Sequence, residues 1–211
     1  MNPVQAPAVA LREGRFPDHP TIVVTDTGLQ YEGGHRDEQI DPDLLVLWEL
    51  WAGTGGGIPL YGQLDPELQR EAADRLLCAY CLKTPDRAPG EGLLWLLRAD
   101  AAERSWPADI ETTTPPICDL HAALALQRCA TLRRGYLAVR VREVERVGVL
   151  GTLFMDGGPD GPDELVRFTE TNRLPYVLAR YMVLALRGAT PDLTLHPDLA
   201  PSPDRPLREV S

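Results

Sequence analysis

Two short pairs of metal-ligating side chains stand out in this chain. Cys78-Ala-Tyr-Cys81 places two thiols three positions apart, and Cys118-Asp-Leu-His121 repeats the spacing with a thiol and an imidazole. A tight turn can aim both members of the first pair at one ion, and residues three apart share one face of a helix. Four thiolate and imidazole ligands are typical of tetrahedral zinc. The sequence therefore predicts one zinc ion held by Cys78, Cys81, Cys118 and His121.

Cys129 competes with His121 for the fourth ligand position. It follows Cys118 by 11 residues, which is about 16 Å along a helix. Zinc–sulfur bonds are only about 2.3 Å long, so the two thiols cannot reach one ion while the helix is intact. Cys129 is therefore predicted to be a buried free thiol. The alternative for the whole set is that its members are four unrelated core residues.

Other patterns in the chain offer little catalytic chemistry. Four protein ligands would close the zinc shell, whereas a catalytic zinc keeps one position open. Pro116-Ile117-Cys118 is similar to part of a nucleobase deaminase motif, but the H-x-E half with its proton-transferring glutamate is missing. The glycine run at 53–57 contains no lysine, so it is interpreted as a linker and not as a phosphate-binding loop. An enzyme with a site built from loops such as 98–116 stays an alternative.

Six arginines gather shortly after the second ligand pair, in a chain whose net charge is −10: Arg128, Arg133, Arg134, Arg140, Arg142 and Arg146. Guanidinium groups match the geometry of phosphates and carboxylates. One interpretation is a docking face for nucleic acid or for an acidic partner. The other is a solvated surface paired with the chain's own aspartates and glutamates.

The local sequence patterns around these groups predict a mixed fold of helices and strands. Helices are expected from Asp41-Pro42 to about Trp51, from Asp65-Pro66 to Leu77, from Cys118 to Leu132 and over 173–187. Strands are expected at 21–25 and 29–31 as a hairpin, at 93–97, and at 136–142 paired with 147–154. In the strand at 136–142, Arg140 is expected to point outward. A loop is expected over 156–163.

A turn, a hairpin and a helix around the two ligand pairs follow the order of a treble clef. The expected fold class is thus α+β, with a treble-clef-like zinc site, short antiparallel strands and about four helices. The expected organisation is a flexible N-terminus at 1–18, one domain at 19–188 and a proline-rich tail at 189–211.

Composition limits where the chain works and what it binds. The chain has 211 residues, a net charge of −10 and a pI near 4.9. This charge disfavours non-specific binding of the whole molecule to nucleic acid or anionic lipid. The sequence shows neither a signal peptide nor the roughly 20 apolar residues of a membrane span, so a cytoplasmic protein is expected. Cysteines in a reducing compartment favour metal ligands over disulfides.

Three runs carry a resemblance to a known group. Leu77-Cys78-x-x-Cys81, Leu94-Trp95-Leu96-Leu97 and Pro115-Pro116-x-Cys118-x-x-His121-Ala122 resemble a group of uncharacterised actinomycete proteins, over roughly residues 40 to 187. The final ligand in that group is often cysteine, which makes His121 a zinc-compatible variant. The resemblance implies no activity.

These observations favour a zinc-binding accessory or regulatory protein that acts on another protein. The alternatives are a nucleic-acid-binding regulator that uses the arginine face, and an enzyme with a loop-built site. A homodimer stays open, because Trp48 and Trp51 offer more apolar surface than one small core is expected to bury.

Overall fold

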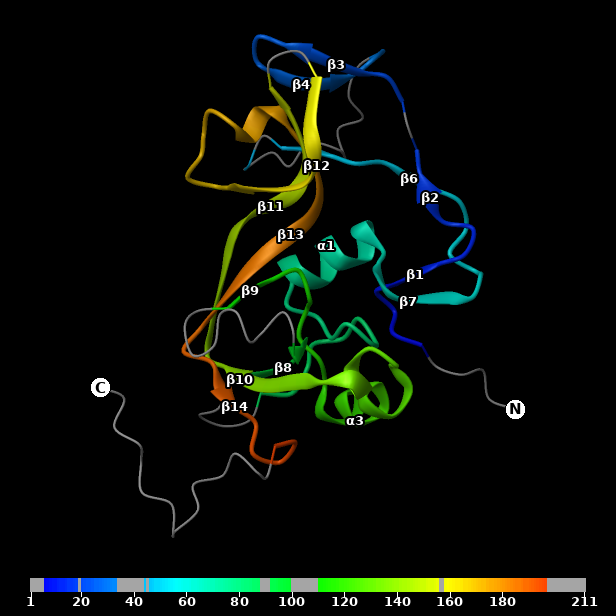
Figure 1. Ribbon diagram of the computed structural model, residues 1–211, viewed down its shortest axis with the longest axis vertical. Helices are drawn as coiled ribbons and strands as arrows, with labels where there is room; N and C mark the ends of the chain where they lie inside the picture. The colour runs from blue at the N-terminus through cyan, green and yellow to red at the C-terminus, as the bar shows by residue number, and fades with distance from the viewer. Residues whose placement is uncertain are drawn as a thin grey trace.

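The computed structural model describes residues 6–18, 20–33, 44, 46–87, 92–99, 110–155 and 158–196, and strands dominate this part of the chain (Figure 1). The α-helices bounded within it are α1 (Pro66–Asp74) and α3 (Asp119–Arg128), and two 3-10 turns are η2 (Leu132–Arg134) and η3 (Leu174–Tyr176). The strands are β1 (Ala10–Arg12), β2 (Phe16–Pro17), β3 (Ile22–Thr25), β4 (Gly28–Tyr31), β5 (Leu47–Trp48), β6 (Trp51–Ala52), β7 (Pro59–Leu64), β8 (Leu93–Arg98), β9 (Ile110–Thr112), β10 (Tyr136–Val141), β11 (Glu143–Met155), β12 (Gly158–Arg167), β13 (Val177–Arg187) and β14 (Thr190–Pro191). The predicted α+β class with about four helices is wrong, and the fold is rich in sheet.

The largest sheet is built around β13. Its strand order is β12-β11-β13-β5, and β9 also pairs with β13. Strand β11 runs antiparallel along one edge of β13, from Glu143 opposite Arg187 to Leu153 opposite Val177. The other edge is shared by two short strands. Parallel β5 pairs at residues 178–179 and antiparallel β9 at residues 184–186, which leaves a gap between them at Met182.

The side chain of Gln69, on α1, fills this gap. Its Nε2 donates a hydrogen bond of 2.9 Å to the Met182 carbonyl, and its Oε1 accepts one of 3.0 Å from the Met182 amide. The same Nε2 donates to the Thr113 carbonyl at 2.7 Å. The side-chain amide thus takes the place of a neighbouring strand and joins α1 to the sheet. Helix α1 begins as predicted, with Asp65 as its N-cap and Pro66 in its first turn.

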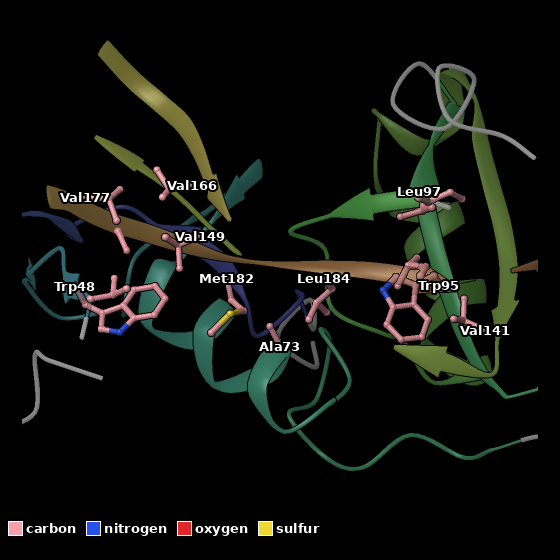
Figure 2. Close-up of a cluster of buried hydrophobic side chains, with 14 of the residues drawn as sticks. Trp48, Ala73, Trp95, Leu97, Val141, Val149, Val166, Val177, Met182 and Leu184 are labelled. Carbon is pink, nitrogen blue, oxygen red and sulfur yellow. The ribbon is translucent and has the colours of Figure 1, made fainter. Parts of the chain in front are cut away.

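One apolar core follows β13 through the molecule. Figure 2 shows Trp48 at one end and Trp95 at the other, with Met182 and Leu184 between them and Ala73 of α1 alongside. Trp48 is only 4% exposed within the single chain. Its burial therefore does not require a second copy of the protein.

Strand β8 is buried on both faces and separates two clusters. Leu93, Trp95 and Leu97 join the core along β13. Leu94 and Leu96 point to the opposite face. There they join a second group, called the ligand-side cluster here, with Cys78, Tyr80, Ile117, Ala122, Ala125 and Ala138. Burial on both faces explains why the sequence of this strand, predicted correctly, is continuously apolar.

The helix predicted over 173–187 is instead η3 followed by strand β13. Its run from Met182 to Leu186 is continuously apolar, and periodicity alone cannot distinguish a buried helix from a buried strand. The segment predicted as a helix ending near Trp51 contains β5 and β6, while Asp41 and Pro42 lie outside the described residues. In both segments, pairing with distant strands decides the structure.

Two further expectations about strands are corrected. Strand β10 pairs with β8 and β14 and not with 147–154, which belongs to β11. Residues 158–163 of the predicted loop belong to β12. The expected treble-clef hairpin is also absent from the described residues. Strand β8 has β10 as its partner, and only an isolated bridge joins Leu94 to Ile117.

The described ends of the chain take part in the fold. Strands β1 and β2, within the predicted N-terminal segment 1–18, pair with β7 and β6. We call these four strands the N-terminal arm (Figure 1). Strand β14, within the predicted tail 189–211, pairs with β10. The structure does not describe residues 197–211.

Replacing Gln69 with leucine should lower the free energy of unfolding by about 3 kcal/mol, because it leaves buried backbone groups at Met182 and Thr113 without partners. Urea denaturation measures the loss. The matched control is Glu71→Ala on the exposed face of α1, which removes only a surface ion pair with Arg75 and should cost less than about 0.5 kcal/mol. Equal stability of Gln69→Leu and wild type would contradict the bridging role.

Candidate metal centre

The structure brings the four predicted ligands together. One ligand atom from each of Cys78, Cys81, Cys118 and His121 lies within 4.8 Å of the others. The two pairs come from segments about 40 residues apart in the chain. Cys78 is buried, and the other three side chains are partly buried. This geometry is compatible with a metal site.

The first pair lies on a tight turn over residues 78–83. The Leu82 amide donates to the Cys78 carbonyl, and the Cys78 amide donates to the Lys83 carbonyl, each at 2.8 Å. Leu82 has a φ of 53°, the left-handed conformation that lets the chain reverse here. The Tyr80 amide donates to Cys78 Sγ at 3.4 Å. The turn thus directs one of its own backbone N–H groups at the sulfur of its first predicted ligand.

The second pair lies at the start of α3. Cys118 is the N-cap residue, and its side chain makes no capping hydrogen bond, so its sulfur is directed to the ligand group. His121 follows one helical turn later. The Cys118 amide donates to Cys78 Sγ at 3.3 Å. A helix N-terminus also favours negative charge, which suits thiolate ligands.

Backbone hydrogen bonds hold the two ligand segments against each other. The Ala79 amide donates to the Pro116 carbonyl at 2.8 Å, and the Ile117 amide donates to the Leu94 carbonyl at 2.9 Å. The N-terminal segment adds two more bonds, from the Ala8 and Val9 amides to carbonyls of the turn, each at 3.1 Å. The position of the ligands is therefore fixed by β8 and by the N-terminal segment.

The His121 ring is oriented by Tyr80. The two rings stack with their centroids 4.8 Å apart and an interplanar angle of 11°. Nδ1 of His121 lies 3.5 Å from Cys78 Sγ, so Nδ1 is the ring nitrogen that faces the ligand group. A metal bound there needs Nδ1 unprotonated, which places the ring proton on Nε2.

Burial and, after it, hydrogen bonding with Cys78 raise the pKa of the Cys118 thiol to about 12. The neighbouring sulfurs of Cys78 and Cys81 contribute to this rise in the pKa of Cys118, because they would repel its thiolate. A divalent cation reverses this balance, because it compensates the thiolate charge.

Cys129 does not belong to the ligand group that the structure brings together. It is the C-cap residue of α3, where its amide donates to the Ala125 carbonyl. It is a free cysteine, but it is only partly buried and not fully buried as predicted. The cluster in the structure thus consists of the four residues that were predicted as ligands, with His121 as its fourth member.

The six predicted arginines do not form one face. Arg128, Arg133, Arg134 and Arg142 are exposed, and Arg146 pairs with Asp74. Arg140, expected to point outward, is 7% exposed. Its Nε donates to Asp192 at 2.6 Å and its Nη2 to Asp119 at 2.9 Å.

Arg140 has a role that the sequence pattern around it does not predict. Asp119 is the first residue of α3, so this network ties the ligand-bearing helix to the segment after β14. Burial alone would raise the pKa of Asp192, but hydrogen bonds from Thr194 and Arg140 lower it below its ordinary value. The carboxylate therefore stays ionised beside the guanidinium. No local pattern marks this pair, because its members are 52 residues apart.

Among the described residues, neither helix is long and apolar enough to cross a membrane. Comparisons of the chain with protein-family models, with curated proteins and with solved structures find no match in any of the three. The resemblance to an actinomycete group thus stays a prediction, and function has to be argued from the site itself.

Replacing Cys78 with serine should remove bound metal and lower the free energy of unfolding by more than about 4 kcal/mol, since metal binding is coupled to folding. Chemical denaturation with metal analysis of the same samples measures both effects. The matched control is Cys129→Ala, which should keep the metal content of wild type. A wild-type denaturation curve for Cys78→Ser would contradict a structural role, and metal loss in Cys129→Ala would contradict the ligand set.

Metal affinity should rise with pH. The raised pKa of Cys118 means that the metal-free thiol is protonated near neutral pH, and this proton must leave when the metal binds. For each proton released on binding, the metal affinity should rise about tenfold with every increase of one pH unit below the thiol pKa. Competition with a chromophoric chelator at about pH 7.5 and about pH 8.5 measures the change. The same affinity at both pH values would show that the thiols are already ionised before metal binds.

Proposed function

We propose that the chain binds one zinc ion through Cys78, Cys81, Cys118 and His121. The observation that carries the proposal is the convergence of these four ligand atoms within 4.8 Å. Three thiolates and one imidazole are soft and borderline ligands, which select zinc over magnesium or calcium. Cysteine-rich sets of four are typical of structural zinc.

The role proposed for the zinc is structural. Four protein ligands complete a tetrahedral shell and leave no position for water or substrate. The site also lies against apolar side chains of the ligand-side cluster, including Leu94 and Ile117. A metal in this place joins the turn at 78–83 to α3 and thereby stabilises the packing of both against Leu94 and Leu96 of β8.

The function proposed for the whole chain is that of an accessory or regulatory protein that binds another protein. Support comes from large apolar side chains exposed on and directly beside the N-terminal arm. Phe16 of β2 is 56% exposed, and Ile58, the residue before β7, is 66% exposed. Exposed apolar surface favours a protein contact. Glu13, between β1 and β2, donates its amide to the Ile58 carbonyl, which joins the segment that carries Phe16 to the segment that carries Ile58.

Binding of nucleic acid through the arginines is the second candidate, and the geometry weakens it. Arg140 is occupied by two aspartates and Arg146 by Asp74. Such a function would have to rest on the exposed Arg133 and Arg134 with Arg128 and Arg142. Steep loss of binding with added salt would be its signature.

Elemental analysis of protein purified without a metal-binding tag should give one zinc per chain. A separate experiment tests the protein contact. Proteins cross-linked to wild type in its own cells should be lost with the double variant Phe16→Ser/Ile58→Ser and kept with Val23→Ser, an exposed apolar position outside the arm. A stable fold without metal would refute the zinc proposal. Identical cross-linked proteins from wild type and double variant would refute the arm as the contact.

A further inference from the structure

A cavity of about 620 Å³ lies where the N-terminal segment, α3 and the largest sheet come together. Its volume is within the range of about 300–1,000 Å³ that is typical of small-molecule sites. The walls come from the segment at 7–10, β7, β8, the loop at 112–117, α3 and the sheet of β11, β12 and β13. Elements far apart in the chain thus meet around one space.

Backbone hydrogen bonds hold two of these walls in place. The Val9 amide donates to the Ala79 carbonyl at 3.1 Å, and the Val9 carbonyl accepts from the Asp65 amide at 2.8 Å. The wall formed by the sheet is continuous, with Leu150 of β11 paired opposite Leu165 of β12. The cavity is therefore bounded by regular, hydrogen-bonded structure and is a built part of the fold.

The described lining is apolar on several sides. The sheet contributes Leu150 and Leu165 together with Val183 of β13. Leu96 of β8 and Ala125 of α3 line the wall nearest the ligand-side cluster. Apolar walls suit a hydrocarbon body, which gains free energy when it leaves water.

Several polar groups of the lining are already bonded within the fold. Arg167 donates two hydrogen bonds to the Glu111 carboxylate, at 2.6 and 3.0 Å. The Thr114 carbonyl accepts a bond of 2.9 Å from Trp95 Nε1, and the Thr112 hydroxyl accepts one of 3.0 Å from the Thr114 amide. Because these groups have partners, this wall favours a molecule that needs no hydrogen bond from it.

We propose that this cavity binds a neutral, predominantly apolar small molecule, whose hydrocarbon body packs against Leu150, Leu165 and Leu96. Burial of apolar surface supplies the affinity. Arg98 and Arg128 also belong to the lining, but both are exposed and have interactions of their own, so neither is assigned to the ligand. This binding function is separate from the protein contact and from the zinc proposed above.

Displacement of a neutral dye from the full-length protein tests the binding. N-phenyl-1-naphthylamine, whose fluorescence rises in apolar surroundings, should bind saturably. 1-Hexanol, 1-octanol and 1-decanol should displace it, and each added CH₂ should tighten binding about fourfold, which corresponds to about 0.8 kcal/mol per buried CH₂. Absence of saturable dye binding to the folded wild type would overturn the proposal, as would an affinity that does not rise with chain length.

Two ions with the same hydrocarbon chain as 1-decanol test whether the ligand is neutral. Decanoate and decylammonium carry opposite charges at about pH 7.5, and moving either charge out of water costs free energy. 1-Decanol should therefore bind more tightly than both. Equal or tighter binding of either ion would overturn the assignment of a neutral ligand.

A matched pair of variants tests the location. Leu165→Trp should fill the cavity and abolish dye binding, whereas Glu164→Trp, at the neighbouring exposed position of β12 outside the described lining, should bind like wild type. Leu150→Trp, on the opposite strand, serves as the second filling variant if Leu165→Trp does not fold. Wild-type affinity in a folded filling variant would overturn the location. Zinc content, measured in the same samples, distinguishes these results from failure of the metal proposal.

Discussion

The packing around the metal centre depends on one electrostatic constraint. Three cysteine sulfurs and an imidazole nitrogen lie within 4.8 Å of one another, beside the apolar ligand-side cluster. Ionised thiolates at this separation repel strongly, and burial adds to the cost. Two amides directed at Cys78 Sγ and the N-terminus of α3 present positive partial charge to the ligand group. A divalent cation bound there, as proposed above, would offset the remaining cost.

Both described ends of the chain are attached to this centre. The N-terminal segment binds the turn through the Ala8 and Val9 amides, and the segment after β14 binds α3 through Asp192, Arg140 and Asp119. Strand β8 completes the arrangement, since its two faces belong to two different clusters. Loss of order at the ligands would therefore loosen the contact between the ligand-side cluster and the core along β13.

The sequence predicted those features whose cause is local. The ligand spacings, the Asp65-Pro66 helix start and the doubly buried β8 depend on neighbouring residues, and each lies where it was expected. The pairing of β13 could not be predicted, because its apolar run suits a helix equally well and its partners β5 and β9 are distant in the chain. Arg140 was placed outward for the same reason. Its burial depends on Asp192 and Asp119, which are 52 and 21 residues away.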